Sequence, residues 1–223
     1  MREAESFKGI NLIIVGELLG LFSTLIANTS SVPVNYFWGM LSNNALDQGN
    51  AVSGAVAVAV LLAGAISYAS VIVLFIGFIK MSKCDFKFKE AIVITVIALL
   101  VDLSGVFLNN VFGNFVIVVS SIADLWMCVA VIQGLVNIFD KREDDTMSDK
   151  GIRVMRLVLA LYVFSIIGGI MLQFFGSNPS LTNFSIIAVI IITVLQVVIY
   201  TFYIKYLFHS RKVLLVKEIA IQS

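Results

Sequence analysis

Six long apolar runs, separated by short polar connections, constrain the fold of this 223-residue chain more than any other feature. The runs cover residues 10–29, 52–79, 91–109, 115–138, 155–175 and 184–206. A helix of about 20 apolar residues is long enough to cross the hydrocarbon core of a bilayer. Only 13% of the residues are charged, compared with about 25% in ordinary soluble domains. The sequence therefore predicts an all-α polytopic membrane protein, with six transmembrane helices in a single membrane domain that covers residues 1–223.

The positions of the lysine and arginine residues predict how these helices are oriented. All 15 lie before the first run, in or beside the second and fourth connections, or at the C-terminal end. The first, third and fifth connections contain none. Because positively charged connections stay on the cytoplasmic side, we expect three helical hairpins in the cytoplasmic (cell) membrane, with both termini inside.

Stripes of small residues predict where the helices pack most closely. Residues four apart lie on the same face of a helix. In the second run, small side chains follow this spacing at Ala51, Ala55, Ala59, Ala63 and Ser67. In the first run, Gly16 and Gly20 form a shorter version. Lipid provides no hydrophobic drive for helix association, so close van der Waals contact between small residues marks helix interfaces. We expect these seven residues to serve helix packing.

Three carboxylic acids interrupt the runs at similar depths. Asp102 and Asp124 lie about 12 Å and about 15 Å from the outer ends of their helices, at about 1.5 Å per residue. Glu17 lies about 13 Å from the inner end of the first run by the same measure. The hydrocarbon core is about 30 Å thick. All three acids are therefore expected near the middle of the membrane.

An ionised aspartate at this depth costs on the order of 2.5–3.5 kcal/mol on insertion scales, and no Lys or Arg lies at that depth to offset it. Intramembrane acids are by default candidates for a proton or cation pathway. We therefore expect a protein that moves a small solute or cation through the six-helix bundle. The expected proton, cation or ligand sites are Asp102, Asp124, Glu17 and Gln196.

Two alternatives remain open. In the first, the acids are neutral and only form hydrogen bonds between helices. In the second, the chain is a non-transporting membrane protein, such as an accessory subunit, an assembly factor or an immunity-type protein that binds another membrane protein. A small-residue face that points outward would imply such a partner, or a homo-oligomer. A closed bundle with a polar cavity around the acids would imply transport.

Enzyme activity, cofactors, bound metals and nucleic-acid partners are not expected. An intramembrane aspartyl protease is disfavoured because Asp102 is followed by Leu-Ser-Gly and the chain contains no Gly-x-Gly-Asp stretch. The single histidine, His209, has no cluster of Cys or His residues to bind a metal with it. Cys84 and Cys128 fall at different depths, so we expect two free thiols. The expected surroundings are the lipid bilayer.

Overall fold

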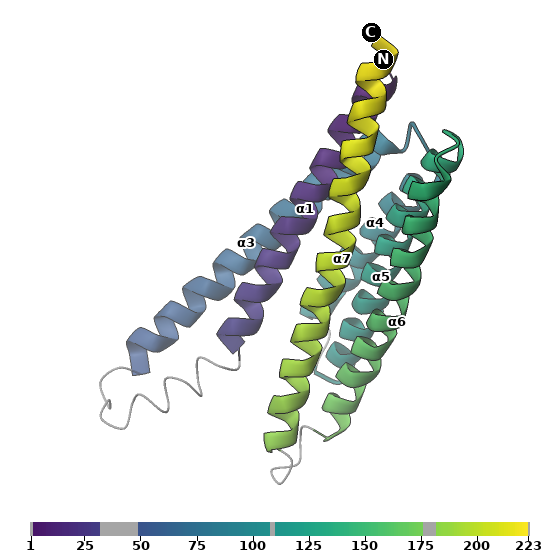
Figure 1. Ribbon diagram of the computed structural model, residues 1–223. Coiled ribbons are helices and arrows are strands. Elements are labelled where there is room, and N and C mark those ends of the chain that lie inside the picture. The colour runs from purple at the N-terminus through teal and green to yellow at the C-terminus, as the bar shows by residue number, and fades with distance from the viewer. Residues whose placement is uncertain (1, 32–48, 108–109, 176–181, 223) are drawn as a thin grey trace.

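The computed structural model describes residues 2–31, 49–107, 110–175 and 182–222. These residues form six helices and no strand. The helices are α1 (Arg2–Ser31), α3 (Gly49–Met81), α4 (Lys87–Phe107), α5 (Asn110–Asp140), α6 (Asp145–Phe175) and α7 (Thr182–Gln222), shown in Figure 1. Each apolar run corresponds to one helix, so the all-α prediction is confirmed for the described residues.

Membrane-spanning character is clearest in two of the helices. Among the described residues, Leu61–Met81 of α3 and Ile122–Asp140 of α5 are long and apolar enough to cross a bilayer. The crossing of the membrane by all six helices, and its direction, stay predictions.

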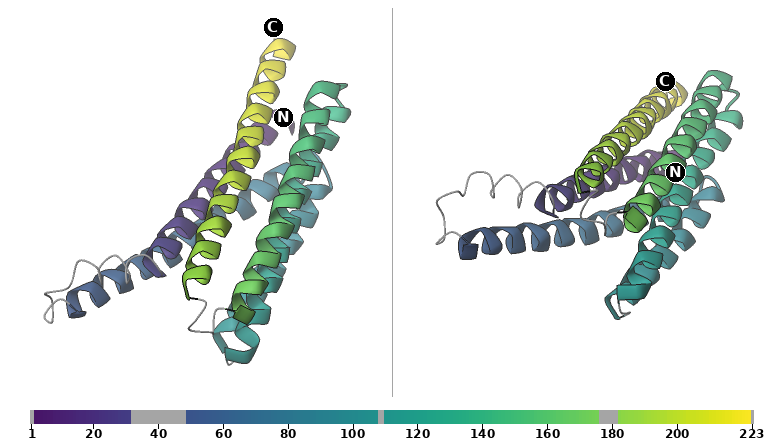
Figure 2. Two further views of the ribbon diagram at one scale, coloured as in Figure 1. Left: turned by 60° about the horizontal axis from the view of Figure 1, so that its bottom comes forward. Right: turned by 90° about the horizontal axis from the view of Figure 1, so that it is seen from below.

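The helices are arranged as a ring. Each helix packs against two others, in the order α1, α3, α4, α5, α6, α7 and back to α1. The most extensive of these contacts joins α1 to α3, and the least extensive joins α3 to α4. The α1–α3 pair leans away from α4–α7 at one end of the molecule, as Figures 1 and 2 show. The described N-terminal and C-terminal residues both lie at the opposite end of the molecule (Figure 1).

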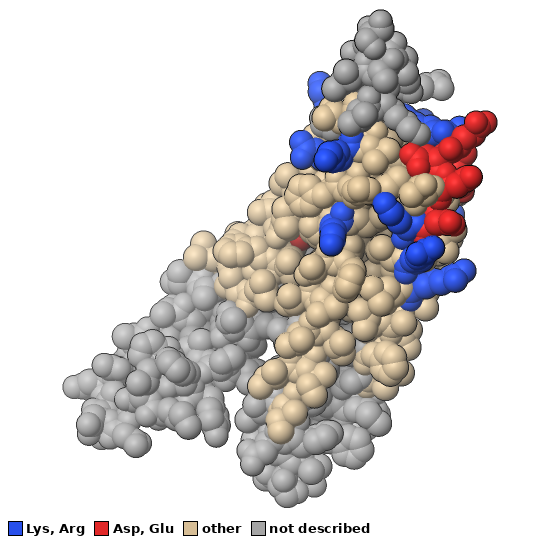
Figure 3. All heavy atoms as spheres, viewed as in Figure 1, with Lys and Arg blue, Asp and Glu red and all other residues tan. Residues whose placement is uncertain are grey.

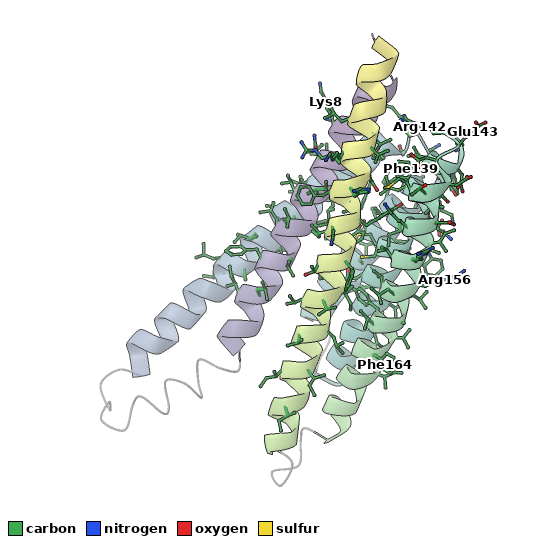
Figure 4. The ribbon with its side chains drawn as sticks, viewed as in Figure 1. Lys8, Phe139, Arg142, Glu143, Arg156 and Phe164 are labelled. Atoms are coloured by element: carbon green, nitrogen blue, oxygen red, sulfur yellow. The ribbon has the colours of Figure 1, made fainter. Side chains whose placement is uncertain are left out.

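Charged side chains gather at the end that carries the termini, which we name the charged end (Figure 3). Lys8 of α1 lies there together with Arg142 and Glu143 of the α5–α6 turn, as Figure 4 shows. Phe164 of α6 projects from the apolar part of the molecule, with 66% of its surface exposed. Most of the described length of the bundle therefore presents apolar side chains outward.

The α1–α3 pair is close because both helices place glycine at the crossing. A Cβ atom added to Gly77 of α3 would lie 3.0 Å from the backbone nitrogen of Ile13 and 3.2 Å from the carbonyl oxygen of Gly9. Only a residue without a side chain allows this approach of the two backbones. Gly16 of α1 lies similarly close to Leu74, whose Cγ would be 2.6 Å from an added Cβ.

Two buried serines cross-link the same pair through backbone carbonyls. The Ser70 hydroxyl donates a hydrogen bond to the carbonyl oxygen of Gly16 at 2.8 Å. The Ser23 hydroxyl donates to the carbonyl oxygen of Ala63 at 2.7 Å. Hydrogen bonds of this kind between membrane helices contribute about 0.6 kcal/mol each on average. They fix the relative position of α1 and α3 along their axes.

The turn between α3 and α4 is held by Asp85, which is buried. Its Oδ1 accepts hydrogen bonds from the backbone N–H of Lys87 at 3.0 Å and from the Asn137 amide at 3.1 Å. Its Oδ2 forms an ion pair with Lys141 at 2.8 Å. Burial alone would raise the pKa of Asp85, but the hydrogen bonds from Lys141, Lys87 and Asn137 hold it below its usual value. This group, the Asp85 cluster, joins the α3–α4 turn to the end of α5.

Candidate functional site

A cavity of about 170 Å³ lies inside the ring, between five of the six helices. Its walls come from α1, α3, α4, α5 and α7. The polar side chains that line it are Glu17, Ser67, Ser70, Thr95, Asp124 and Tyr200. The apolar part of the wall includes Val71, Leu74, Ile94, Leu99 and Met127. The cavity is partly open rather than sealed.

Glu17 is the most deeply buried acid of the site, with 2% of its surface exposed. It lies on α1, and its Oε1 accepts a hydrogen bond from the Tyr203 hydroxyl of α7 at 3.0 Å. Tyr203 is itself fully buried. The bond joins two segments that are 186 residues apart in the chain and closes the ring between its first and last helices.

Asp124 supplies the second carboxyl of the cavity from α5. It is exposed, unlike Glu17. Its charge acts on Glu17 electrostatically. Two carboxylates in one small space repel each other when both are ionised, and a cation between them removes that repulsion. The pair is therefore suited to hold either a shared proton or a bound cation.

The hydroxyl groups of the wall present acceptor atoms to the cavity. Ser70 already donates its proton to the Gly16 carbonyl. Thr95 donates to the Ala91 carbonyl at 2.8 Å and also lies 3.5 Å from the Met127 sulfur. A hydroxyl has one proton and two acceptor lone pairs, so both residues have lone pairs left. The walls therefore favour a ligand that donates hydrogen bonds or carries positive charge.

Of the four residues predicted to form the site, Glu17 and Asp124 are brought together at the cavity. The contact between Thr95 and Met127 places Asp124 level with Ala98 on the antiparallel helix α4. Asp102 lies four residues further along α4, which is about 6 Å. The side chains of Asp102 and Gln196 lie outside the described residues.

The residues predicted to serve packing divide between two environments. Gly16 lies against Leu74, Gly20 lies near the Ser70 hydroxyl, and Ala63 is buried. Ser67 is exposed and lines the cavity. The side chains of Ala51, Ala55 and Ala59 lie outside the described residues.

Sequence reasoning missed Ser70 as a part of the site, whereas Tyr203 belongs to the polar stripe of the last run that is expected to face the interior. Ser70 continues the spacing of Ala63 and Ser67 along one face of α3, and this pattern was available as a signal. Tyr203 shares a helix face with Gln196 and Tyr200, but nothing in the sequence indicates that it meets Glu17.

No known protein family, curated protein or solved structure matches this chain. Within the described part of the chain, no group of three or more His, Cys, Asp or Glu residues is placed to hold a metal ion. A bound Ca²⁺ takes six to eight oxygen ligands, commonly from several carboxylates. The cavity, with two described carboxyls, does not fit that requirement.

Proposed function

We propose that this protein is a multi-pass membrane protein that binds a small cation in the cavity and moves it through the six-helix bundle. The observation that carries the proposal is the cavity inside the ring, which Glu17 and Asp124 line together with hydroxyl acceptors. Intramembrane acids that face such a space are expected to mark an ion or substrate pathway.

The outer surface supports the membrane location. Large apolar side chains are exposed on every helix, for example Phe22, Leu61, Leu100, Phe164 and Ile187. A contiguous apolar surface of this extent is unusual for a soluble monomer and is expected where lipid covers the protein. On the face that Figure 3 shows, most charged side chains of the described residues gather at one end, as expected for connections that remain on the cytoplasmic side.

The packing of the ring suggests how a ligand passes. Between the cavity and the charged end lie fully buried apolar side chains, among them Phe78, Phe88 and Phe139, and beyond them the Asp85 cluster. The cavity begins near Leu74, about 10 Å from the end of α3 at about 1.5 Å per residue. Because α3 and α4 share the least contact in the ring, their separation provides the entrance. Release at the charged end requires the Asp85 cluster to open.

The alternative of a non-transporting accessory protein stays a second candidate, because Ser67 of the small-residue stripe on α3 is exposed and the side chains of Ala51, Ala55 and Ala59 lie outside the described residues. Its expected signature is a small-residue face that points outward to a partner. In the described residues, Gly9, Gly16 and Gly77 lie at the crossing of α1 and α3, within the chain itself. Those residues are therefore used for internal packing.

Charge movement in reconstituted liposomes tests the proposal. Inward gradients of H⁺, Na⁺, K⁺ and methylammonium would be imposed one at a time, and the current recorded on a solid-supported membrane. We expect a saturable current with at least one of these cations. It should fall at least tenfold in Asp124→Asn and Glu17→Gln. Asp149→Asn, which removes an exposed acid of α6 at the charged end, is the matched control and should retain the current.

Two outcomes would contradict the proposal. One is a current no larger than that of protein-free liposomes for all four cations. The other is a current that Asp124→Asn and Glu17→Gln leave as large as in the wild type.

A further inference from the structure

The size of the cavity limits its occupant. An engineered apolar cavity of about 150 Å³ holds benzene, a molecule of about six non-hydrogen atoms. Pockets for drug-sized ligands span about 300–1,000 Å³. The cavity of about 170 Å³ therefore has room for one molecule of about six non-hydrogen atoms or for a few waters.

The charge of the wall selects the sign of the occupant. Among the described residues that line the cavity, none is Lys, Arg or His, whereas Glu17 and Asp124 are acids. The remaining polar groups offer lone pairs, as described above for Ser70 and Thr95. An anion would meet repulsion on every polar side, and a neutral apolar molecule would leave these acceptors without a partner.

The apolar part of the cavity wall favours the binding of organic cations over inorganic cations. Leu74, Leu99 and Met127 present hydrocarbon and a polarisable sulfur to the same space. Tyr200 adds an aromatic ring, whose face attracts a nearby ammonium group. A bare metal ion would make no favourable contact with these apolar side chains. An alkyl group attached to an ammonium centre would lose its contact with water there, and the burial of this apolar surface is favourable.

We infer that the cavity takes a small organic monocation, with one ammonium centre and no more than about six non-hydrogen atoms. This inference rests on the proposed function and names the substrate class of the same site. The ammonium group lies between Glu17 and Asp124, and the alkyl part contacts the wall formed by α3 and α4.

Binding to the purified full-length protein tests the inference with isosteric probes. tert-Butylammonium and tert-butanol have the same shape and differ in charge. We expect tert-butylammonium to raise the melting temperature saturably, because a ligand that binds only the folded state stabilises it. We expect tert-butanol to bind at least tenfold more weakly. Tetramethylammonium should also bind, and the much bulkier tetrapropylammonium should not.

Two variants and one control locate the binding site. Asp124→Asn should weaken the binding of tert-butylammonium at least tenfold, and Asp149→Asn should not change it. Ala98→Leu places a larger side chain on the cavity wall and should abolish binding even though both acids remain. Size-exclusion profiles identical to the wild type would show that each variant is folded.

The outcomes separate this inference from the proposed function. A current carried by H⁺ or Na⁺ without any binding of tert-butylammonium would overturn the inference and leave the proposed function standing. Equal binding of tert-butanol and tert-butylammonium would also overturn the inference. The absence of a current with every cation, together with no binding of tert-butylammonium, would overturn both.

Discussion

Asp85 shows how one side chain can organise a turn whose sequence is that of an ordinary polar loop. Its carboxylate accepts a hydrogen bond from the Lys87 N–H at the start of α4. It also binds the side chains of Asn137 and Lys141 at the end of α5. An aspartate at the start of a helix commonly accepts backbone N–H bonds. Its additional partners make Asp85 a link between two hairpins at the charged end.

We expect Asp85→Asn to destabilise the protein by about 1.5–3 kcal/mol, because the buried side chain loses the charge that strengthens its hydrogen bonds from Lys87 and Asn137. The ion pair itself contributes little, since Lys141 is 63% exposed. Unfolding by SDS titration, compared with Asp149→Asn, measures the difference. The control should change the free energy of unfolding by less than about 0.5 kcal/mol, as surface substitutions usually do. Equal stability of the two variants would show that the Asp85 cluster has no structural role.

The pH dependence of this contribution has a defined sign. Because the folded-state pKa of Asp85 is lowered, its stabilising effect is fully present above the unfolded-state pKa of about 3.9. The effect is lost as the pH falls through the lower folded-state value. The stability difference between wild type and Asp85→Asn should therefore be constant from pH 5 to 7 and shrink below pH 4. A difference that shrinks between pH 7 and pH 5 would contradict the assignment.

Tyr203 gives a second prediction at the scale of a single bond. Tyr203→Phe removes the hydroxyl that donates a hydrogen bond to Glu17 Oε1 and keeps the shape of the side-chain ring. We expect a loss of about 0.6 kcal/mol, and at most about 1.7 kcal/mol, in the free energy of unfolding. Tyr68→Phe, which removes an exposed hydroxyl from α3, is the control and should be neutral. An equal effect of both substitutions would show that the Glu17 bond does not hold α1 to α7.

Among the elements, the α1–α3 pair depends on backbone approach. Gly77→Ala would place a methyl group against the backbone of Ile13 and Gly9, which cannot move aside as a side chain can. Overpacking of this kind costs about 1–3 kcal/mol. Gly64→Ala on the same helix is the matched control, because an added Cβ there meets nothing within 4 Å. It should be neutral or stabilising by up to about 1 kcal/mol. If Gly64→Ala lowered the free energy of unfolding more than Gly77→Ala, α1 and α3 would not be closely packed at Gly77.

The positions of the helices could be predicted from the sequence, because long apolar runs have few structural solutions. Their pairing could not. Apolar spacing indicates which face of a helix avoids water, but α3 carries apolar residues on almost all sides, so periodicity cannot select its partner. The contact between Gly134 and the Phe88 ring illustrates this limit, since neither residue is distinctive within its own run.

The site was predictable to a similar degree. Depth alone placed Glu17 and Asp124 in one layer, because helix rise converts residue number into height. Their meeting at one cavity depends on the rotation of each helix, which packing between distant segments decides. The bond between Tyr203 and Glu17 depends on the closing of the ring by α1 and α7, and no local sequence signal reports that closure.

At the scale of the whole molecule, the ring predicts a membrane topology that labelling can measure. An even number of crossings brings the α3–α4 turn, the α5–α6 turn and both termini to one side. In a variant without its native cysteines, Cys84 and Cys128, a cysteine at position 149 should react with an impermeant maleimide only after cells are permeabilised. A cysteine at position 44, in the first connection, should react in intact cells. Tags at the two termini should both be protected in intact cells.

Labelling of position 149 from outside, or termini on opposite sides, would contradict six crossings with cytoplasmic termini. In that case, the gathering of Lys and Arg side chains at the charged end would need an origin other than the positive-inside rule.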